Sequence, residues 1–223
     1  SNSYDVTFEA YDVKQATFAA SLFQKDIEGF FSSRRSPATR DILTDYGFTD
    51  DFLDFDIQTT VNGGSATIKG LELSYRQSFG FLPRWGRGLQ VFANLTKLRL
   101  SGPNADDFTN FTPTEFNWGV GYGIGKFYVR ANTVTTDPNR VQLASAATSS
   151  RAAVYDYRGA LTRTDISVGY QLSKRFVVYA VVRNLQSAEI ALQRYDPSTP
   201  QYLRPRNYQF STTDFTLGVR GEF

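Results

Sequence analysis

Four aspartates lie close together between residues 50 and 56, and carboxylates at short spacing are typical of calcium-binding loops. They are Asp50, Asp51, Asp54 and Asp56. A helix–loop–helix calcium site places acidic ligands at alternate positions, followed by a glycine at the sixth position and a glutamate at the twelfth. This run has neither that spacing nor that glutamate, so the sequence favours a solvated loop over a metal site.

Glycines at alternate positions offer a second possible chemistry, because glycine-rich loops bind phosphate groups. They are Gly119, Gly121 and Gly123. A phosphate-binding loop joins a strand to a helix, whereas these glycines alternate with apolar residues and no helical pattern follows them. We therefore expect a strand whose glycines either let another segment approach closely or permit curvature.

The composition argues against catalysis. The 223 residues include no cysteine and no histidine, which removes thiol chemistry and the commonest general base and metal ligand. The net charge of +2 gives no argument for a nucleic-acid partner. We expect no enzyme activity, no catalytic residue, no metal site and no cofactor. Because methionine is also missing, we expect a processed product or a part of a longer protein.

Arginine and tyrosine gather in the last long polar stretch, from Ala191 to Thr212. Guanidinium groups and phenol rings together suit anionic or sugar-like ligands. The alternative is an ordinary solvated loop with arginine side chains reaching into water. The candidate ligand-binding residues are Tyr195, Tyr202, Arg204, Arg206 and Tyr208.

Strict alternation of apolar and polar residues recurs along the chain and predicts β-strands. The longest apolar run, Phe176–Val182, is far shorter than the roughly 20 residues of a membrane-spanning helix. Nine segments alternate: residues 4–11, 17–23, 71–76, 89–96, 116–124, 127–132, 165–172, 176–183 and 214–223. We therefore predict an all-β fold without a sustained helical segment.

The connections between these segments alternate in length. Short ones cover residues 12–15, 81–88, 125–126 and 173–175, and long ones cover 31–66, 101–113, 137–160 and 191–212. This order is typical of an antiparallel transmembrane β-barrel, with tight periplasmic turns and long external loops, whereas a soluble sandwich mixes loop lengths.

The last strand shows the two faces that such a barrel requires. A spanning strand presents apolar side chains to lipid and polar ones to the lumen. Phe215, Leu217, Val219 and Phe223 are assigned to lipid, and the C-terminal phenylalanine resembles the signal read by the outer-membrane barrel assembly machinery. The same alternation assigns charged residues to the lumen wall: Glu72, Arg76, Arg130, Asp165, Arg183, Asp214, Arg220 and Glu222.

The number of strands indicates that more of the barrel exists. Bacterial single-chain barrels have an even number of strands, and a closed barrel leaves no edge unpaired. Phe52–Val61 could be a tenth strand, but counting it would break the alternation of loop lengths, so we assign it to a folded external loop. With nine to ten strands, the chain is expected to be the C-terminal part of a larger barrel.

Two stretches resemble the TonB-dependent outer-membrane receptors. One is residues 62–75, NGGSATIKGLELSY, and the other is Val182-Arg183-Asn184-Leu185, which precedes the long loop and the phenylalanine-terminated strand. The resemblance covers essentially the whole chain and implies a 22-stranded barrel, of which residues 1–223 form the C-terminal portion without the plug domain. It implies uptake of a siderophore, vitamin or glycan across the Gram-negative outer membrane.

The resemblance also implies partners. These are the plug and remaining strands of the same receptor, TonB with ExbB and ExbD through the plug, the barrel assembly machinery, and lipopolysaccharide and lipid. Arg34, Arg35 and Arg40 are candidates for contact with lipopolysaccharide phosphates. The alternatives are a passive porin or small free-standing barrel, and a non-transporting surface or adhesion protein.

Overall fold

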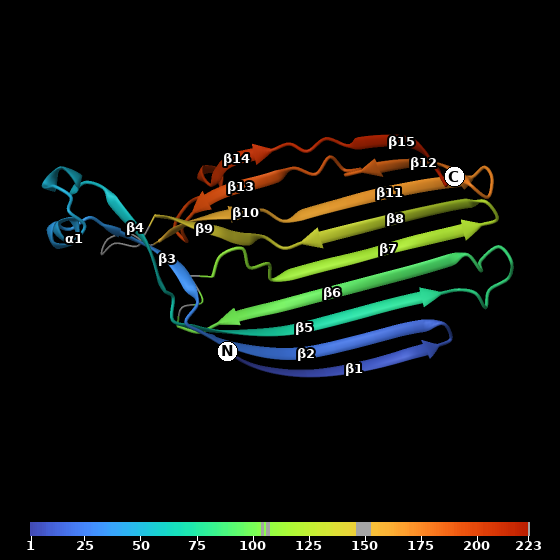
Figure 1. The fold of residues 1–223 in the computed structure, drawn as a ribbon, viewed down its shortest axis with the longest axis horizontal. Helices are drawn as coiled ribbons and strands as arrows, with labels where there is room; N and C mark the ends of the chain where they lie inside the picture. Colours follow the sequence, from blue (N-terminus) through green and yellow to red (C-terminus); the bar gives the residue numbers. More distant parts are fainter. Residues whose placement is uncertain (104, 106–107, 146–152, 223) are drawn as a thin grey trace.

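The main sheet contains nine antiparallel strands (Figure 1). A computed structural model describes residues 1–103, 105, 108–145 and 153–222. In spatial order the strands are β1 (Asn2–Val13), β2 (Ala16–Glu28), β5 (Ser65–Ser78), β6 (Leu89–Ser101), β7 (Thr114–Ile124), β8 (Phe127–Thr136), β11 (Leu161–Gln171), β12 (Phe176–Arg183) and β15 (Asp214–Gly221). These strands coincide with the nine alternating segments, which confirms that prediction.

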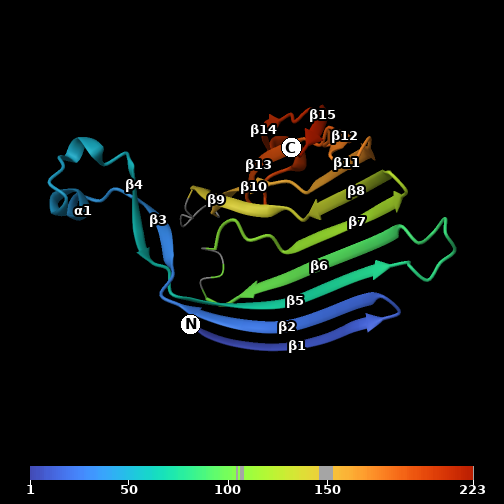
Figure 2. The same cartoon turned by 45° about the vertical axis from the view of Figure 1, so that its right-hand side comes forward.

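The segment between β2 and β5 forms a separate hairpin. Strand β3 (Phe31–Pro37) pairs with β4 (Asp56–Asn62), and α1 (Arg40–Asp45) and η1 (Asp50–Phe52) lie between them. The hairpin projects from the long-loop end of the main sheet (Figure 2). The assignment of Phe52–Val61 to a folded loop is therefore confirmed.

Two other long connections also contain strands, which the sequence did not reveal. They form a four-stranded sheet, called here the loop sheet, in the order β14 (Pro205–Gln209), β13 (Ile190–Tyr195), β10 (Val154–Arg158) and β9 (Asn139–Ser145). Each strand has only five to seven residues, and a 3-10 turn, η3 (Gln201–Leu203), separates β13 from β14. Such short strands depend on their neighbours more than on intrinsic propensity, so alternation alone does not identify them.

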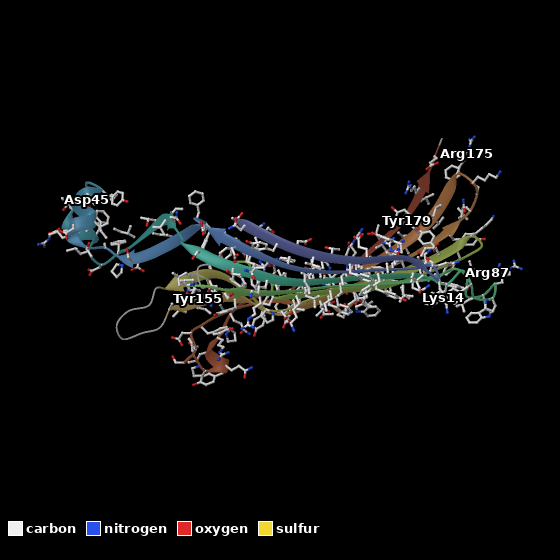
Figure 3. All side chains as sticks on the ribbon, turned by 90° about the horizontal axis from the view of Figure 1, so that it is seen from below. Lys14, Asp45, Arg87, Tyr155, Arg175 and Tyr179 are labelled. Atoms are coloured by element: carbon white, nitrogen blue, oxygen red, sulfur yellow. The ribbon has the colours of Figure 1, made fainter. Side chains whose placement is uncertain are left out.

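The connections separate by length to opposite ends of the sheet. The turn between β1 and β2 consists of Lys14 and Gln15, both with positive φ (54° and 64°), as a tight hairpin turn requires. Lys14, Arg87 and Arg175 mark the short-turn end, and Asp45 and Tyr155 mark the opposite end (Figure 3). The predicted alternation of short and long connections is thus present.

Strand register extends one polar face and one apolar face across all nine strands, because residues directly opposite each other share a face. One apolar row consists of Val91, Val120, Ala131, Ile166, Val182 and Phe215, and the polar Gln77 lies at its β5 end. The next polar row consists of Gln90, Gly121, Arg130, Ser167, Val181 and Thr216. The alternation in the sequence therefore gives a sheet with one polar and one apolar face.

A second row on the polar face alternates glycine with tyrosine. It consists of Gly123, Tyr128, Gly169, Tyr179 and Gly218 on five neighbouring strands. A Cβ atom at Gly169 would overlap the ring of Tyr128, and one at Gly218 would overlap the ring of Tyr179. Phe23 covers Gly70 and Phe92 covers Gly119 in the same way. These rings supply the packing that glycine lacks.

The main sheet is a single layer. The accessible surface is 15295 Å², whereas a compact monomer of this mass exposes roughly 10,000 Å². Buried hydrophobic residues within the described ranges are only Ala38, Leu43 and Ala66, while Leu217 on the apolar face is 80% exposed. In the part of the chain that the structure describes, no helix is long and apolar enough to cross a membrane. Within the described residues, the main sheet does not pack against a second sheet as it would in a sandwich.

The two edge strands run in the same direction. Each neighbouring pair in the nine-stranded sheet is antiparallel, so β1 and β15, which are eight steps apart, are parallel to each other. They cannot pair antiparallel to close a barrel. Antiparallel closure needs an even number of strands, so the expectation of further strands stays a prediction.

Leu73 and Ser74 provide a matched test of the two faces. Leu73 lies opposite Ala20 and Leu95 on the apolar face, and Ser74 lies opposite Ala19 and Asn94. An arginine on the lipid face near the midplane costs about 2–4 kcal/mol. We expect Leu73→Arg to lower the yield of heat-modifiable barrel in outer membranes strongly, and Ser74→Arg to change it little. Equal yields of the two variants would contradict the assignment of faces.

Candidate functional site

The charged residues assigned to the lumen wall share the polar face. Register places Glu72, Arg76, Arg130, Asp165, Arg183 and Arg220 on it, together with Asp214. Arg183 pairs with Asp214 at 2.9 Å, and Arg163 approaches Asp165 at 3.9 Å. Within the described residues, the other four have no ion pair. Their role as the wall of a lumen stays a prediction.

The polar face is acidic near the β1 edge of the sheet and carries basic residues near the β15 edge. A hollow of about 460 Å³ over β1, β2, β5 and β6 is lined by Asp5, Glu9 and Glu72, with no cation among its lining residues. At the opposite edge, a hollow of about 760 Å³ is lined by Arg175, Arg220 and other residues, including Lys174 and Glu222. A partner that lies against the polar face therefore meets an acidic and a basic region.

The middle of the polar face carries unsatisfied acceptors. The side-chain oxygens of Asn117 and Asn132 are shielded from water and accept no hydrogen bond. Beside them, a Cβ atom at Gly121 or Gly123 would meet only a backbone oxygen, at 4.0 and 3.9 Å, whereas Gly119 is covered by Phe92. Buried unpaired acceptors are uncommon in folded proteins, and because these two oxygens are shielded, another segment reaches them only if neighbouring side chains move.

The structure brings two of the five candidate ligand-binding residues together in the loop sheet. The ring of Tyr195 stacks on that of Tyr157, with centroids 4.1 Å apart. The guanidinium of Arg204 lies 4.4 Å from the Tyr195 ring centroid, and that of Arg140 lies 4.0 Å from the Tyr155 centroid. We call these five residues, Arg140, Tyr155, Tyr157, Tyr195 and Arg204, the tyrosine–arginine cluster. Burial raises the pKa of Tyr195, so its phenol stays protonated at neutral pH.

The other three candidates lie apart from this cluster. Arg206 binds Asp156, while Tyr202 in η3 is 78% exposed and Tyr208 in β14 is 43% exposed. Tyr155 and Tyr157 were missed because they fall in a stretch read as a loop. The Tyr155-Asp156-Tyr157 alternation was the only signal, and it is too short to identify a strand.

Three residues of the tyrosine–arginine cluster, Arg140, Tyr157 and Tyr195, line a hollow of about 440 Å³ that also includes Asp137. Its walls include Tyr157, Tyr195, Arg140, Phe108 and Phe111. Aromatic faces with a guanidinium group can hold a flat or ring-shaped ligand that carries negative charge or hydroxyl groups. In the residues that the structure describes, no three acidic side chains lie close enough to hold a metal ion.

A buried carboxylate holds the loop sheet together. The side chain of Asp156 is only 4% exposed and accepts hydrogen bonds from Arg194 at 2.7 and 3.0 Å. It also accepts one from Gln142 at 2.8 Å and one from Arg206. These donors come from β9, β13 and β14, so one side chain on β10 joins all four strands. The hydrogen bonds from Arg194, followed by those from Gln142, hold the pKa of Asp156 below its ordinary value.

Asp156→Asn is expected to destabilise the loop sheet by about 1–3 kcal/mol at pH 7, because two arginines lose their shared anion. Since the pKa of Asp156 is lower in the folded state, its contribution is present above the ordinary value of about 3.9 and is lost as the pH falls below it. Amide hydrogen exchange in β10 and β13 measures both effects. Equal protection of wild type and variant at pH 7 would contradict this role.

Comparison with known proteins adds an independent observation. A family model described as TonB dependent receptor-like, beta-barrel matches residues 1–185. Among curated proteins, none matches the chain. The matched residues include eight of the nine strands of the main sheet, all except β15. The chain therefore belongs to the TonB-dependent receptor-like β-barrel family, a family of outer-membrane transporters of Gram-negative bacteria.

Proposed function

We propose that the chain forms the C-terminal part of a TonB-dependent receptor that imports a scarce nutrient across the outer membrane. The observation that carries the proposal is the single-layer sheet, whose apolar face has no protein partner within the described residues and whose polar face carries charge. Lipid covers such an apolar face, and the family match supports transport rather than enzyme activity.

The polar face is proposed to contact a plug domain. Gly121 and Gly123 leave room for a close approach of backbone. The acidic hollow beside Glu72 and the basic hollow beside Arg220 offer complementary charges to a polar domain inside the barrel. Through this plug, TonB with ExbB and ExbD would supply the energy for import.

The tyrosine–arginine cluster is proposed as the first contact for the nutrient. It lies at the end of the sheet that carries the long connections, and the long loops of outer-membrane barrels face the outside of the cell. Its hollow includes Leu100, which register places on the polar face of β6. A ligand released from the cluster would enter the lumen.

The size of the native protein tests the proposal of a larger barrel. We expect an antibody against this region to detect, in detergent-extracted outer membranes, a species several times 25.1 kDa. That result would place a plug and further strands in the same chain. A species near 25.1 kDa would contradict the TonB-coupled function and favour a small or oligomeric porin.

Tyr195→Ala and Tyr202→Ala provide a matched pair for the ligand site. Tyr195 lies in the stack with Tyr157, whereas Tyr202 is exposed in η3. Loss of one aromatic contact costs about 0.5–1.5 kcal/mol, so Tyr195→Ala should raise the dissociation constant about 2- to 12-fold. The measurement uses the nutrient whose uptake is lost when the receptor gene is deleted. Equal affinities of the two variants for this nutrient would contradict a role of the tyrosine–arginine cluster in binding it.

A further inference from the structure

The projecting hairpin has a small apolar core of its own. Leu43 in α1 is only 2% exposed, and Ala38 is also buried. Backbone hydrogen bonds close the segment around them: the amide of Ala38 donates to the carbonyl of Phe55 at 2.8 Å, and the amide of Phe48 donates to the carbonyl of Leu43 at 2.8 Å. The segment between β3 and β4 is therefore a folded unit that holds its side chains in fixed positions.

Four aromatic rings of this unit surround a hollow of about 380 Å³. The rings are those of Tyr46, Phe48, Phe52 and Phe55, which are between 41% and 62% exposed. The planes of Phe48 and Phe52 are inclined at 62°, with centroids 5.5 Å apart, and those of Phe52 and Phe55 at 58°, with centroids 5.6 Å apart. Rings inclined in this way form the walls of a concave site rather than a flat stack. We call the four rings, with Asp56 beside them, the hairpin cup.

The carboxylates at the hairpin cup lack counter-charges. Asp56 is one of the residues that line the hollow. Asp51 and Asp54 each directly precede a phenylalanine of the cup, and neighbouring Cα atoms are about 3.8 Å apart. None of these three aspartates forms an ion pair with a residue that the structure describes. Their negative charge is therefore available to a ligand in the cup.

The whole hairpin is acidic. Residues 31–62 contain six aspartates and three arginines, which gives a net charge of −3. Among the arginines assigned from the sequence to lipopolysaccharide contact, Arg40 pairs with Asp50 at 2.9 Å. The side chains of Arg34 and Arg35 lie outside the described residues, so that assignment stays a prediction. The charge of the hairpin favours a cationic ligand.

The chemistry of the cup fits an organic cation better than other ligands. A cation is attracted to the face of an aromatic ring, and several rings together recognise quaternary ammonium groups. The apolar walls contact the methyl groups of such a cation, while Asp56 adds attraction for its charge. An inorganic cation needs several oxygen ligands, and in the described part of the chain no three acidic side chains lie close enough to hold a metal ion. An anion is repelled by the surrounding carboxylates.

We propose that the hairpin cup binds a small organic cation that carries an alkylated ammonium group. Its volume of about 380 Å³ lies within the range of small-molecule sites. Its preference for charge is opposite to that of the tyrosine–arginine cluster, where Arg140 lines the hollow. The cup also lies on the hairpin that projects from the long-loop end of the main sheet (Figure 2). It is therefore a second site, separate from the proposed contact for the nutrient.

Choline and 3,3-dimethylbutan-1-ol test the proposal on the unaltered receptor, because the two molecules share a shape and differ in charge. The receptor is purified from outer membranes in a nonionic detergent without ammonium groups. Saturation-transfer NMR on the methyl signal of each probe measures its dissociation constant. We expect choline to bind about tenfold more tightly than the neutral alcohol, because only choline gains from the ring faces and the carboxylate.

Variants of the hairpin locate the site. Phe55→Leu removes a ring but keeps an apolar side chain, Phe55→Tyr keeps a ring, and Asp56→Asn removes a charge from the wall. Asp45→Asn is the matched control, because Asp45 is an exposed aspartate of α1 that does not line the cup. We expect Phe55→Leu and Asp56→Asn each to weaken choline binding about 2- to 5-fold, while Phe55→Tyr and Asp45→Asn bind as wild type. Amide hydrogen exchange at Leu43 shows whether the hairpin stays folded.

Equal affinity of the wild type for choline and for the neutral alcohol would overturn the proposal and favour an apolar docking surface for another protein. Unchanged choline affinity in both Phe55→Leu and Asp56→Asn would also overturn it, because the cation would then lie elsewhere. If Phe55→Leu unfolds the hairpin, the comparison of Asp56→Asn with Asp45→Asn decides. Loss of the proposed import function in a receptor that still binds choline would contradict that function alone.

Discussion

The fold depends on the requirement that every backbone polar group in a bilayer be paired within the protein. A continuous antiparallel sheet meets this requirement along each of its inner strands, and it leaves the side chains free to differ between the two faces. Valine, leucine and aromatic residues can then be exposed to the surroundings without forming a protein core. This explains how a chain of 223 residues can have only three buried hydrophobic residues within its described part.

The loop sheet follows a different rule, because water surrounds it. Its strands are too short to be stable by pairing alone, and a buried carboxylate with two arginines takes the place of a core. Asp156 faces one way, while its neighbours Tyr155 and Tyr157 face the other and contact Arg140. The strand alternation that separates lipid from water in the membrane thus separates the structural contacts of the loop sheet from its candidate ligand surface.

Alternation identified the nine spanning strands because each one must satisfy two different environments over eight or more residues. It missed β9, β10, β13 and β14 because each is short, and their pairing is decided by contacts between distant loops. The same limit applies to the ligand site. Tyr195 and Arg204 could be named from residue type alone, but the partners Tyr157 and Arg140 come from another connection, whose position no local pattern records. Phe223 of the C-terminal signal lies outside the described residues, whereas Phe215, Leu217 and Val219 share the apolar face.

The row of alternating glycine and tyrosine has a consequence for how strands find their partners. A slip of one residue moves each side chain to the wrong face, so the division into polar and apolar faces already rejects it. A slip of two residues keeps every side chain on its correct face, and alternation cannot detect it. At the β8–β11 and β12–β15 pairings, such a slip would remove Tyr128 from Gly169 and Tyr179 from Gly218. Tyr179, for example, would face Thr216 or Arg220 instead. The tyrosine ring does not fit over these larger side chains. The positions of the glycines therefore disfavour a strand register that is shifted by two residues.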